Sequence, residues 1–316
     1  ATMFMVFEAV ETGRLSLEDE LPVSEKAWRK GGSKMFVEVG SQVAVSDLMR
    51  GVIIQSGNDA TIVLAEALAG TEDAFAASMT ERMQELGMTN SQFMNASGWP
   101  NPEHYSTARD LALLATTMIE RFPQFYSIYS EREFTYNDIR QGNRNPLLYR
   151  GVGADGLKTG HTEEAGYGLV ASAKRGERRV VMVINGLPSV QARADESAKL
   201  LQWAFANFRS YQIGEAGAVM HEAPVWLGAA ERVPMVLEDS IFLTLTSNEA
   251  GNLDVFVELD QPIPAPIQQG QVIGHLVVDA PEGEQRFPLT AGADVPQRDF
   301  MGRVEAALTH LVFGGQ

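Results

Sequence analysis

Two apolar runs of strand length lie close together in the middle of the chain. Residues 167–173 read Tyr-Gly-Leu-Val-Ala-Ser-Ala, and residues 180–185 read Val-Val-Met-Val-Ile-Asn. The stretch between them, 174–179, is polar and contains one glycine. Short apolar runs joined by a polar turn are typical of an antiparallel hairpin. The pattern therefore predicts a hairpin over 167–185, with residues 158–160 leading into its first strand.

Longer apolar stretches indicate helices before and after this hairpin. Residues 2–12 predict a buried helix that ends at Gly13, because glycine commonly closes a helix. Residues 60–69 predict another, which ends at Gly70. Residues 195–208 predict a third. Its core candidates recur at helical intervals: Ala198, Leu201, Trp203, Ala204 and Phe208.

Two further segments carry weaker patterns. Residues 35–40 and 42–45 alternate over short distances and predict two short strands joined by a Gly-Ser turn. Residues 130–153 are polar and show no periodicity, which predicts irregular structure.

The pattern changes after residue 211. Between 217 and 295, short alternating runs are broken by proline, glycine and acidic turns at intervals of roughly 8–12 residues, which is typical of a small β-sandwich or barrel. Residues 299–313 return to helical spacing, with Phe300 and Val304 on the apolar face. Such a helix can pack on the β-domain or lie in a membrane interface.

Composition narrows the possible functions. A formal net charge of −16 argues against a protein that binds the phosphate backbone of nucleic acids. The 316 residues include no cysteine, which excludes disulfides, and no apolar run of about 18 residues that could cross a membrane as a helix. The spacing of the five histidines matches no zinc motif. Neither a metal nor a cofactor is predicted.

The triplet Lys158-Thr159-Gly160 is the first candidate for chemistry. Glycines flank it, so that a ligand could approach the backbone closely. An edge strand at this place could pair with an extended peptide, and Lys158 would add a positive charge beside it. Taken alone, the triplet could equally be a surface lysine in a turn.

The second candidate is Ser56-Gly57-Asn58, which lies between two apolar segments. A short turn of this kind can project a hydroxyl and an amide from one loop. The residues could instead only cap the helix that follows. Ser-Asp-Asn, Lys-Thr-Gly and Ser-x-x-Lys together mark penicillin-binding proteins and class A β-lactamases. In this chain the middle residue of the first triplet is glycine.

Longer strings make the resemblance specific. The chain resembles the low-molecular-mass D-alanyl-D-alanine carboxypeptidases, the class of penicillin-binding proteins 5 and 6 in peptidase family S11, and the resemblance extends over nearly its whole length. The strings that carry it are 55–60, 126–129, 141–145, 158–162 and 193–201.

The resemblance implies an α+β fold with three parts. Residues 1–210 would form a penicillin-binding, β-lactamase-like domain in which helices pack on an antiparallel sheet. Residues 211–296 would form a small all-β domain. Residues 297–316 would form an amphipathic helix, which in this family is the usual membrane anchor.

The resemblance also implies roles for particular residues. Ser56, Asn58 and Lys158 would be catalytic. Ser56 would relay a proton to the leaving amine, and Asn58 would hold the substrate amide. Substrate binding would fall to Thr159, Gly160, His161, Arg144 and Arg193. Thr159 would bind the terminal carboxylate, and the backbone N–H of His161 would contribute to an oxyanion hole.

One departure from the family concerns the nucleophile, which belongs to a Ser-x-x-Lys motif at the start of a helix. No serine stands three places before any lysine of this chain. The residues at those places are Val23, Ala27, Gly31, Asp155, Ala171 and Glu196. By the resemblance, the motif would fall just before Ala1, and residues 1–5 look like the interior of its helix. We therefore expect these 316 residues alone to be neither hydrolytic nor acylated by penicillin.

The implied substrate is a peptidoglycan stem peptide ending in D-Ala-D-Ala, and β-lactam antibiotics would bind the same site. The implied location is the periplasm, on the outer face of the bacterial inner membrane, with the membrane surface as a further partner. Three alternatives remain open. They are a class A β-lactamase-like hydrolase, a transpeptidase, and a non-catalytic module that binds or scaffolds peptidoglycan.

Overall fold

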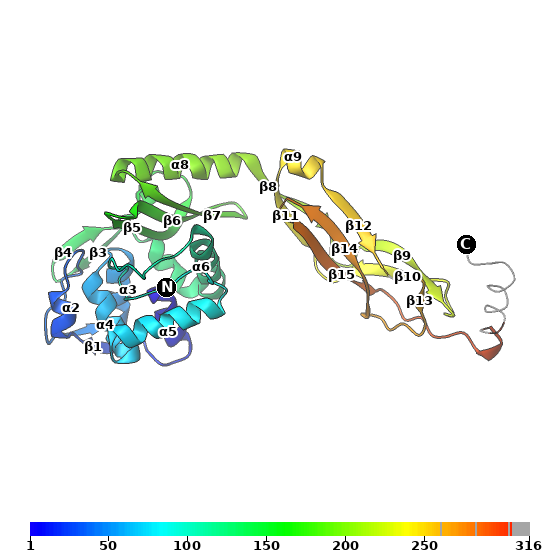
Figure 1. Cartoon of the computed structure of the whole chain (residues 1–316), viewed down its shortest axis with the longest axis horizontal. Coiled ribbons are helices and arrows are strands. Elements are labelled where there is room, and N and C mark those ends of the chain that lie inside the picture. Colours follow the sequence, from blue (N-terminus) through cyan, green and yellow to red (C-terminus); the bar gives the residue numbers. More distant parts are fainter. Residues whose placement is uncertain (260, 282, 303, 305–316) are drawn as a thin grey trace. The chain divides into compact units, whose positions relative to one another are not determined.

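The chain divides into two compact units. The computed structural model describes residues 1–259, 261–281, 283–302 and 304. One unit runs from Ala1 to Ala204, and the other begins at Phe205. Helices and sheets occur together in the first unit and strands dominate the second, so the predicted α+β fold class is confirmed (Figure 1).

A helical core occupies one side of the first unit. Its central helix is α4 (Asn58–Ala69), which is buried on nearly all sides from Asp59 to Ala65. The helices around it are α1 (Thr2–Glu11), α3 (Val45–Ile53), α5 (Glu72–Glu85) and α6 (Ala108–Arg121). Thr71 and Thr107 cap α5 and α6, because each hydroxyl accepts a backbone N–H of the first turn.

An antiparallel sheet forms the other side of this unit. Its strands are β5 (Ala154–Thr162), β6 (Gly166–Arg175) and β7 (Arg178–Leu187), in that order across the sheet. The predicted hairpin over 167–185 is therefore confirmed as β6 and β7. Helix α8 (Val190–Asn207) lies over one face of the sheet, and the helical core lies on the other side (Figure 1). Strand β5 is an edge strand, since it pairs only with β6 in the described sheet.

Two short-range predictions were wrong. Residues 35–40 form no strand, because the backbone N–H groups of Met35, Phe36 and Val37 donate to the carboxylate of Asp59 rather than to a neighbouring strand. Only β2 (Gln42–Ala44) forms, and it pairs with β1 (Glu20–Pro22).

The stretch 130–153, predicted to be irregular, contains a hairpin. Its strands are β3 (Glu133–Tyr136) and β4 (Ile139–Gly142). Asn137 and Asp138 join them with φ angles of 46° and 59°. Two successive positive φ angles are typical of the tight hairpin turns in which Asn and Asp are favoured. The short helices of the unit are α2 (Glu25–Arg29), α7 (Pro123–Tyr126), η1 (Ser127–Ser130) and η2 (Pro146–Tyr149).

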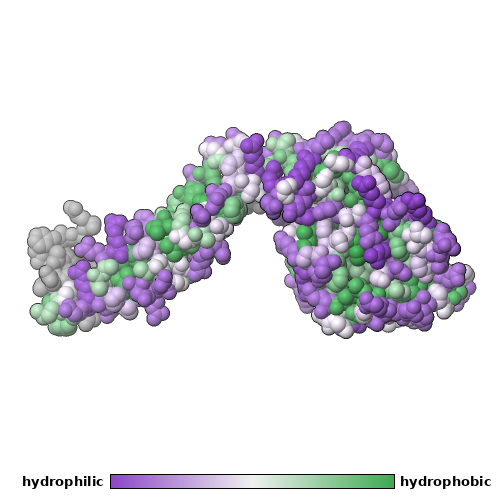
Figure 2. Space-filling view, turned by 180° about the vertical axis from the view of Figure 1, so that it is seen from behind, coloured by the Kyte–Doolittle hydropathy of each residue, from purple (hydrophilic) through white to green (hydrophobic). Residues whose placement is uncertain are grey.

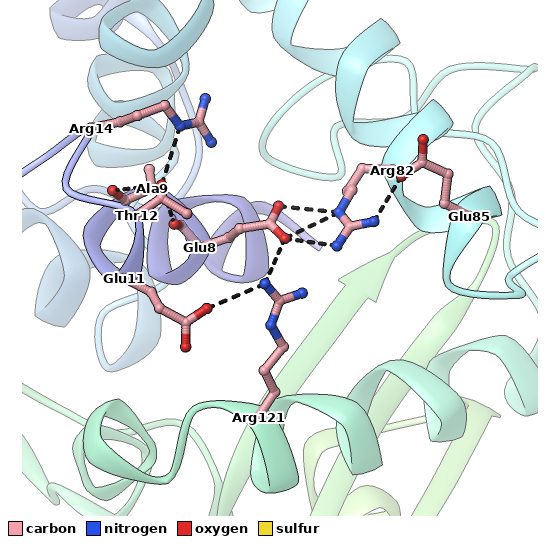
Figure 3. Close-up of polar contacts among 8 residues, drawn as sticks. All are labelled: Glu8, Ala9, Glu11, Thr12, Arg14, Arg82, Glu85 and Arg121. Atoms are coloured by element: carbon pink, nitrogen blue, oxygen red, sulfur yellow. Dashed lines mark hydrogen bonds and ion pairs between the residues drawn. The ribbon is translucent and has the colours of Figure 1, made fainter.

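An ion-pair cluster ties α1 to α5 and α6 (Figure 3). Glu8 accepts from both Arg82 and Arg121, with closest N–O distances of 2.7 and 2.9 Å. Arg82 also pairs with Glu85, and Arg121 with Glu11. The Glu8 side chain is only 13% exposed. The cluster therefore connects three helices through one partly desolvated carboxylate.

The second unit is built from strands. A six-stranded sheet has the order β12-β14-β15-β10-β9-β13, and β8 pairs with β11 beside it. The strand bounds are β8 Phe208–Gly214, β9 Val219–Trp226, β10 Arg232–Leu237, β11 Ile241–Thr246, β12 Asp254–Glu258, β13 Ile263–Pro264, β14 Val272–Ala280 and β15 Gly283–Ala291. One short helix, α9 (Ser247–Gly251), begins with a capping box between Thr246 and Glu249.

This unit has an apolar core of its own, which includes Val233, Met235 and Leu289, each fully buried. Most of the predicted tail helix over 299–313 lies outside the described residues. Among the described residues, no helix is long and apolar enough to cross a membrane. On the face of the first unit drawn in Figure 2, hydrophilic residues cover most of the surface and apolar residues form smaller patches.

Candidate active site

Ser56 lies in the tight connection between α3 and α4. Its φ angle is +58°, a conformation that is costly for a residue with a side chain and that clusters at functional sites. Gly57 follows, and Asn58 begins α4. A Cβ on Gly57 would lie 2.8 Å from Asp59 Oδ1 and 3.0 Å from the Met35 nitrogen. No side chain fits there, which explains the glycine between serine and asparagine.

Asp59 holds the loop in front of α4. Its buried carboxylate accepts the backbone N–H groups of Met35 and Phe36 at 2.9 Å each and that of Val37 at 3.3 Å. The loop also meets α4 through Asn58, whose backbone N–H donates to Ser33 O and whose Nδ2 donates to Gly31 O, both at 2.9 Å. Asp59 was not among the residues predicted from the sequence to form the site. Its only signal was an acidic residue in the first turn of a predicted helix.

Lys158 reaches Ser56 from the sheet. Its Nζ donates to Ser56 Oγ at 2.7 Å and to the Thr159 carbonyl at 2.9 Å. The two triplets are 102 positions apart in sequence, yet they meet at hydrogen-bond distance. Burial, with smaller contributions from the nearby charges of Arg144 and Arg193, lowers the pKa of Lys158 to about 7. Lys158 is therefore poised to exchange a proton near neutral pH.

Arg144 is held at the same place by two buried asparagines. Asn143 donates to the Glu131 carbonyl at 2.9 Å, and Asn145 donates to the Gly156 carbonyl at 2.8 Å. The guanidinium of Arg144 donates to Ser33 Oγ at 2.5 Å. The loop is thus fixed on both sides of Arg144, which keeps this cation beside the cleft.

Arg193 approaches from α8. It is 7% exposed, and its Nε has no hydrogen-bond partner among the described residues. Its guanidinium lies over the ring of Tyr167, 5.6 Å from the centroid, and the same ring stacks on His161 at 3.9 Å. Burial lowers the pKa of Arg193, as expected for a cation without a counter-ion.

One cavity of about 1110 Å³ connects these groups. All eight residues singled out in the sequence line it: Ser56, Asn58, Arg144, Lys158, Thr159, Gly160, His161 and Arg193. Ala1, which precedes α1, and the first two residues of the helix, Thr2 and Met3, line it as well. Among the described lining residues, Glu163 is the one carboxylate. A cleft with three cationic side chains and one acid favours an anionic ligand.

Strand β5 gives the cleft an open edge. The position that a Cβ of Gly160 would occupy has no atom within 4 Å, so the backbone is accessible there. Thr159 is 9% exposed and lies beside Lys158. An extended peptide could add to this edge by main-chain hydrogen bonds, while its carboxylate meets the cations.

The cleft also contains residues that were not predicted from the sequence. Trp99, in the loop before α6, lines the cavity and is 43% exposed. Ser33 and Tyr167 line it too. Tyr167 begins a run predicted to be a strand, but no periodic signal indicated that either residue faces the cleft. His104 is also at the lining, where its Nδ1 accepts the backbone N–H of Met94 at 3.3 Å.

Two family profiles match the chain. That of D-alanyl-D-alanine carboxypeptidase, peptidase S11, matches residues 1–188. That of the C-terminal domain of penicillin-binding protein 5 matches residues 208–297. Together they span both units.

Individual relatives agree with the profiles. The D-alanyl-D-alanine carboxypeptidase DacA of Haemophilus influenzae is 40% identical over 282 residues, which cover 87% of this chain and 72% of the relative. DacA of Escherichia coli K12 is 37% identical over 313 residues, 96% of this chain and 77% of the relative.

Solved structures are similar as well, over different shares of the chain. Penicillin-binding protein 5 from Haemophilus influenzae superposes with a TM-score of 0.82 at 38% identity, covering 94% of this chain and 88% of that one. The Streptomyces K15 DD-transpeptidase has a TM-score of 0.60 at 26% identity and covers 65% of this chain. With both profiles, the relatives and the fold in agreement, the chain belongs to the serine-type D-alanyl-D-alanine carboxypeptidases of peptidase family S11.

Proposed function

We propose that this chain provides the substrate-binding and proton-transfer groups of a carboxypeptidase that removes the terminal D-alanine from peptidoglycan stem peptides through an acyl-enzyme. The observation that carries the proposal is the 2.7 Å contact between Lys158 Nζ and Ser56 Oγ inside a cation-lined cleft. Such a contact gives a hydroxyl a partner for proton transfer.

The carboxylate end of the substrate would lie among the cations. Lys158 and Arg193 would attract it, and Thr159 would donate a hydrogen bond to it. Arg144 would add positive potential from the facing loop. The arrangement supports this role because Arg193 is buried with an unpaired Nε, and a buried cation gains most from a charged hydrogen-bond acceptor.

The peptide bond itself would lie between α4 and β5. Asn58 would hold the substrate amide, and the open edge at Gly160 would pair with the substrate backbone. The His161 N–H would stabilise the oxyanion. When the bond breaks, Ser56 would pass a proton to the D-alanine nitrogen and be reprotonated by Lys158. Water would then hydrolyse the acyl group. Penicillin would occupy the same cleft as a mimic of the dipeptide.

This scheme does not assign the nucleophile that attacks the peptide bond. Ser-x-x-Lys, the motif that carries the nucleophile in the family, does not occur in the 316 residues. The proposal therefore concerns binding and proton transfer around an acyl group rather than the attack itself.

A direct test joins the 316 residues at Ala1 to the Ser-x-x-Lys segment of a family member. We expect this fusion to release D-alanine from an acetylated tripeptide ending in D-Ala-D-Ala and to be labelled by penicillin. The unfused 316 residues, as the control, should do neither, a loss of roughly a million-fold. Folded fusion protein that releases no D-alanine would contradict the proposal. Transfer of the acyl group to added glycine in preference to water would favour the transpeptidase alternative.

We further propose that the protein works in the periplasm, peripheral on the inner membrane through residues 297–316. Family membership supports this location, as does the return of helical spacing at the chain end. Binding to anionic lipid vesicles that is equal with and without residues 297–316 would contradict it.

A further inference from the structure

One short segment of the first unit connects the elements that place cations in the cleft. Residues 143–150 carry Arg144 and include the helix η2. Asn145 lies just before this helix, is buried, and donates from Nδ2 to the Gly156 carbonyl at 2.8 Å. Gly156 stands two places before Lys158 on β5. The segment is therefore fixed to the strand that carries Lys158.

Arg150 ends the segment and reaches α8, the helix that carries Arg193. Its Nη1 donates to the Ala194 carbonyl at 2.9 Å, and its Nη2 donates to the Asp195 carboxylate at 2.7 Å. The two acceptors are the residues that directly follow Arg193. A guanidinium that makes two hydrogen bonds at once fixes direction as well as distance. Arg150 therefore holds the first turns of α8 against the segment.

The Asp195 carboxylate is suited to this contact. It also accepts a hydrogen bond from Gln191 Nε2 at 2.8 Å, one turn earlier on α8. The hydrogen bond from Arg150, together with the one from Gln191, lowers the pKa of the Asp195 carboxyl. Asp195 is thus charged at neutral pH, and the contact with Arg150 is an ion pair.

Arg193 has few contacts of its own that could hold it in place. Its Nε has no hydrogen-bond partner among the described residues, and its guanidinium lies over the ring of Tyr167. The place of this guanidinium in the cleft therefore depends on where the backbone of α8 lies. A hydrogen bond weakens steeply when its distance and angle depart from the best values. A small shift of α8 should consequently weaken the contact between Arg193 and a bound carboxylate.

We infer that Arg150 is a positioning residue, which holds Arg193 where it can bind the peptide carboxylate together with Lys158. The inference rests on the proposed function. Arg150 is not among the described residues that line the cavity, so it acts through α8 and not by touching the ligand. Asn145 and Arg150 together link β5 to α8, and so link the cation of the strand to the cation of the helix.

The test titrates the 316-residue chain with two peptides. Acetyl-glycyl-D-Ala-D-Ala carries the terminal carboxylate, and its C-terminal amide lacks the charge that Arg193 would bind. Arg150→Met should weaken the acid peptide by about threefold to tenfold, because a displaced cation makes a poorer charged hydrogen bond. The same variant should leave the affinity for the amide peptide unchanged.

A double-mutant cycle separates positioning from a direct role. Arg193→Met should weaken the acid peptide more than Arg150→Met does, since the whole contact is lost. The double variant should bind the acid peptide as Arg193→Met alone does, because Arg150 then has no cation left to position. Losses that simply add in the double variant would overturn the inference.

A conservative variant separates position from charge. Arg150→Lys keeps the positive charge, but an ammonium does not reproduce the planar fork that reaches both acceptors. It should lose nearly as much affinity for the acid peptide as Arg150→Met. Full affinity in Arg150→Lys would show that the charge of Arg150 matters and its hold on α8 does not, and the inference would be wrong.

Arg286 in the second unit provides a matched control. It is a partly exposed arginine that pairs with Glu258 and Glu284, and it does not line the cavity. Arg286→Met removes the same charge from the chain and breaks ion pairs as well. It should leave the affinities for both peptides unchanged.

The positioning role and the proposed function fail in different ways. If the unaltered chain does not bind the acid peptide, the proposed function is wrong and the positioning role with it. If the unaltered chain binds the acid peptide and Arg150→Met binds it equally well, only the positioning role is wrong. Equal loss for the acid and amide peptides in Arg150→Met would indicate general damage to the first unit and would also overturn the role.

Discussion

At the scale of single residues, the main feature of the cleft is a pair of basic side chains that lack counter-ions. Lys158 is half-buried and Arg193 is buried, and each has a pKa below its usual range because partial or full burial disfavours the charged form. Neither has an ion pair within the described residues. The carboxylate of a bound ligand would be the counter-ion that these two side chains lack. Binding of such a ligand would favour the charged form of Lys158, so ligand binding and protonation of Lys158 are coupled.

The first prediction concerns the charge of Lys158. Lys158→Ala should weaken binding of acetyl-glycyl-D-Ala-D-Ala by about 1.5–3 kcal/mol, because a charge-assisted hydrogen bond to the carboxylate is lost. Calorimetric titration would measure this. Lys174→Ala, at an exposed lysine that pairs with Glu177, is the control and should bind normally. Equal affinity in both variants would remove Lys158 from the site.

The second prediction follows from the pKa of about 7 at Lys158. Between pH 7 and 10.5 this lysine is mostly neutral in the folded chain but charged in the unfolded one. The unfolded state then binds more protons, so the contribution of Lys158 to stability rises with pH across that window. Below pH 7 the full cost of burying the charge remains.

The check compares the unaltered chain with Lys158→Met by urea denaturation. The methionine variant should gain more stability at pH 6.5 than at pH 9, since it has no charge to bury. Carboxylate peptide binding to the unaltered chain should weaken as pH rises through 7. A stability difference that does not vary with pH would show that Lys158 is not buried as a charge.

At the scale of elements, α1 is held by the cluster around Glu8 while its first turn borders the cleft. Glu8 joins α1 to two helices through two arginines, so removing it leaves two cations facing each other. Glu85, by contrast, is 66% exposed and pairs only at the outside of Arg82. Glu8 and Glu85 therefore allow a partly buried and an exposed carboxylate of one cluster to be compared.

The third prediction uses that comparison. Glu8→Ala should lower the free energy of unfolding by about 1–3 kcal/mol, because a partly buried charged acceptor is lost. Glu85→Ala should change it by less than about 1 kcal/mol, as surface pairs usually do. Denaturant titration of both variants provides the measurement. A cost for Glu85 as large as that for Glu8 would show that the three-helix connection is not the source of stability.

The secondary-structure elements also show which parts of the fold could be predicted from the sequence and which could not. The β6–β7 hairpin follows from two short apolar runs and a polar turn, and it formed as predicted. Residues 35–37 are apolar as well but form no strand, since their N–H groups donate to the carboxylate of Asp59, which is distant in sequence. The meeting of Ser56 and Lys158 was expected from family motifs, not from periodicity. The place of Trp99 depends on Gly32 and Asn95, whose contacts leave no periodic signal.

At the scale of the whole molecule, each unit has a separate apolar core. The cleft belongs to the first unit, because all of its lining residues lie between Ala1 and Arg193. The second unit contributes none of the described lining residues. Stability of the second core and ligand binding in the first unit should therefore respond to different substitutions.

The fourth prediction tests that separation. Leu289 is fully buried in the second core, so Leu289→Ala should destabilise that unit by about 2–5 kcal/mol. Scanning calorimetry should show one transition shifted and the other unchanged, with unaltered peptide affinity. The matching variant, Leu64→Ala in the first core, should shift the other transition. One common transition that moves in both variants would contradict independent folding.

The open edge of β5 has a second consequence, for the behaviour of the chain in concentrated solution. An edge that can pair with a peptide strand can also pair with the edge of another copy, which is a route to aggregation. Here two carbonyl groups of the strand already have hydrogen-bond partners. Asn145 occupies the Gly156 carbonyl, and the Lys158 ammonium occupies that of Thr159. Two copies brought edge to edge would also bring like charges together at Lys158. The positive charge that suits the cleft to an anionic peptide thus disfavours pairing of β5 with the β5 strand of a second copy.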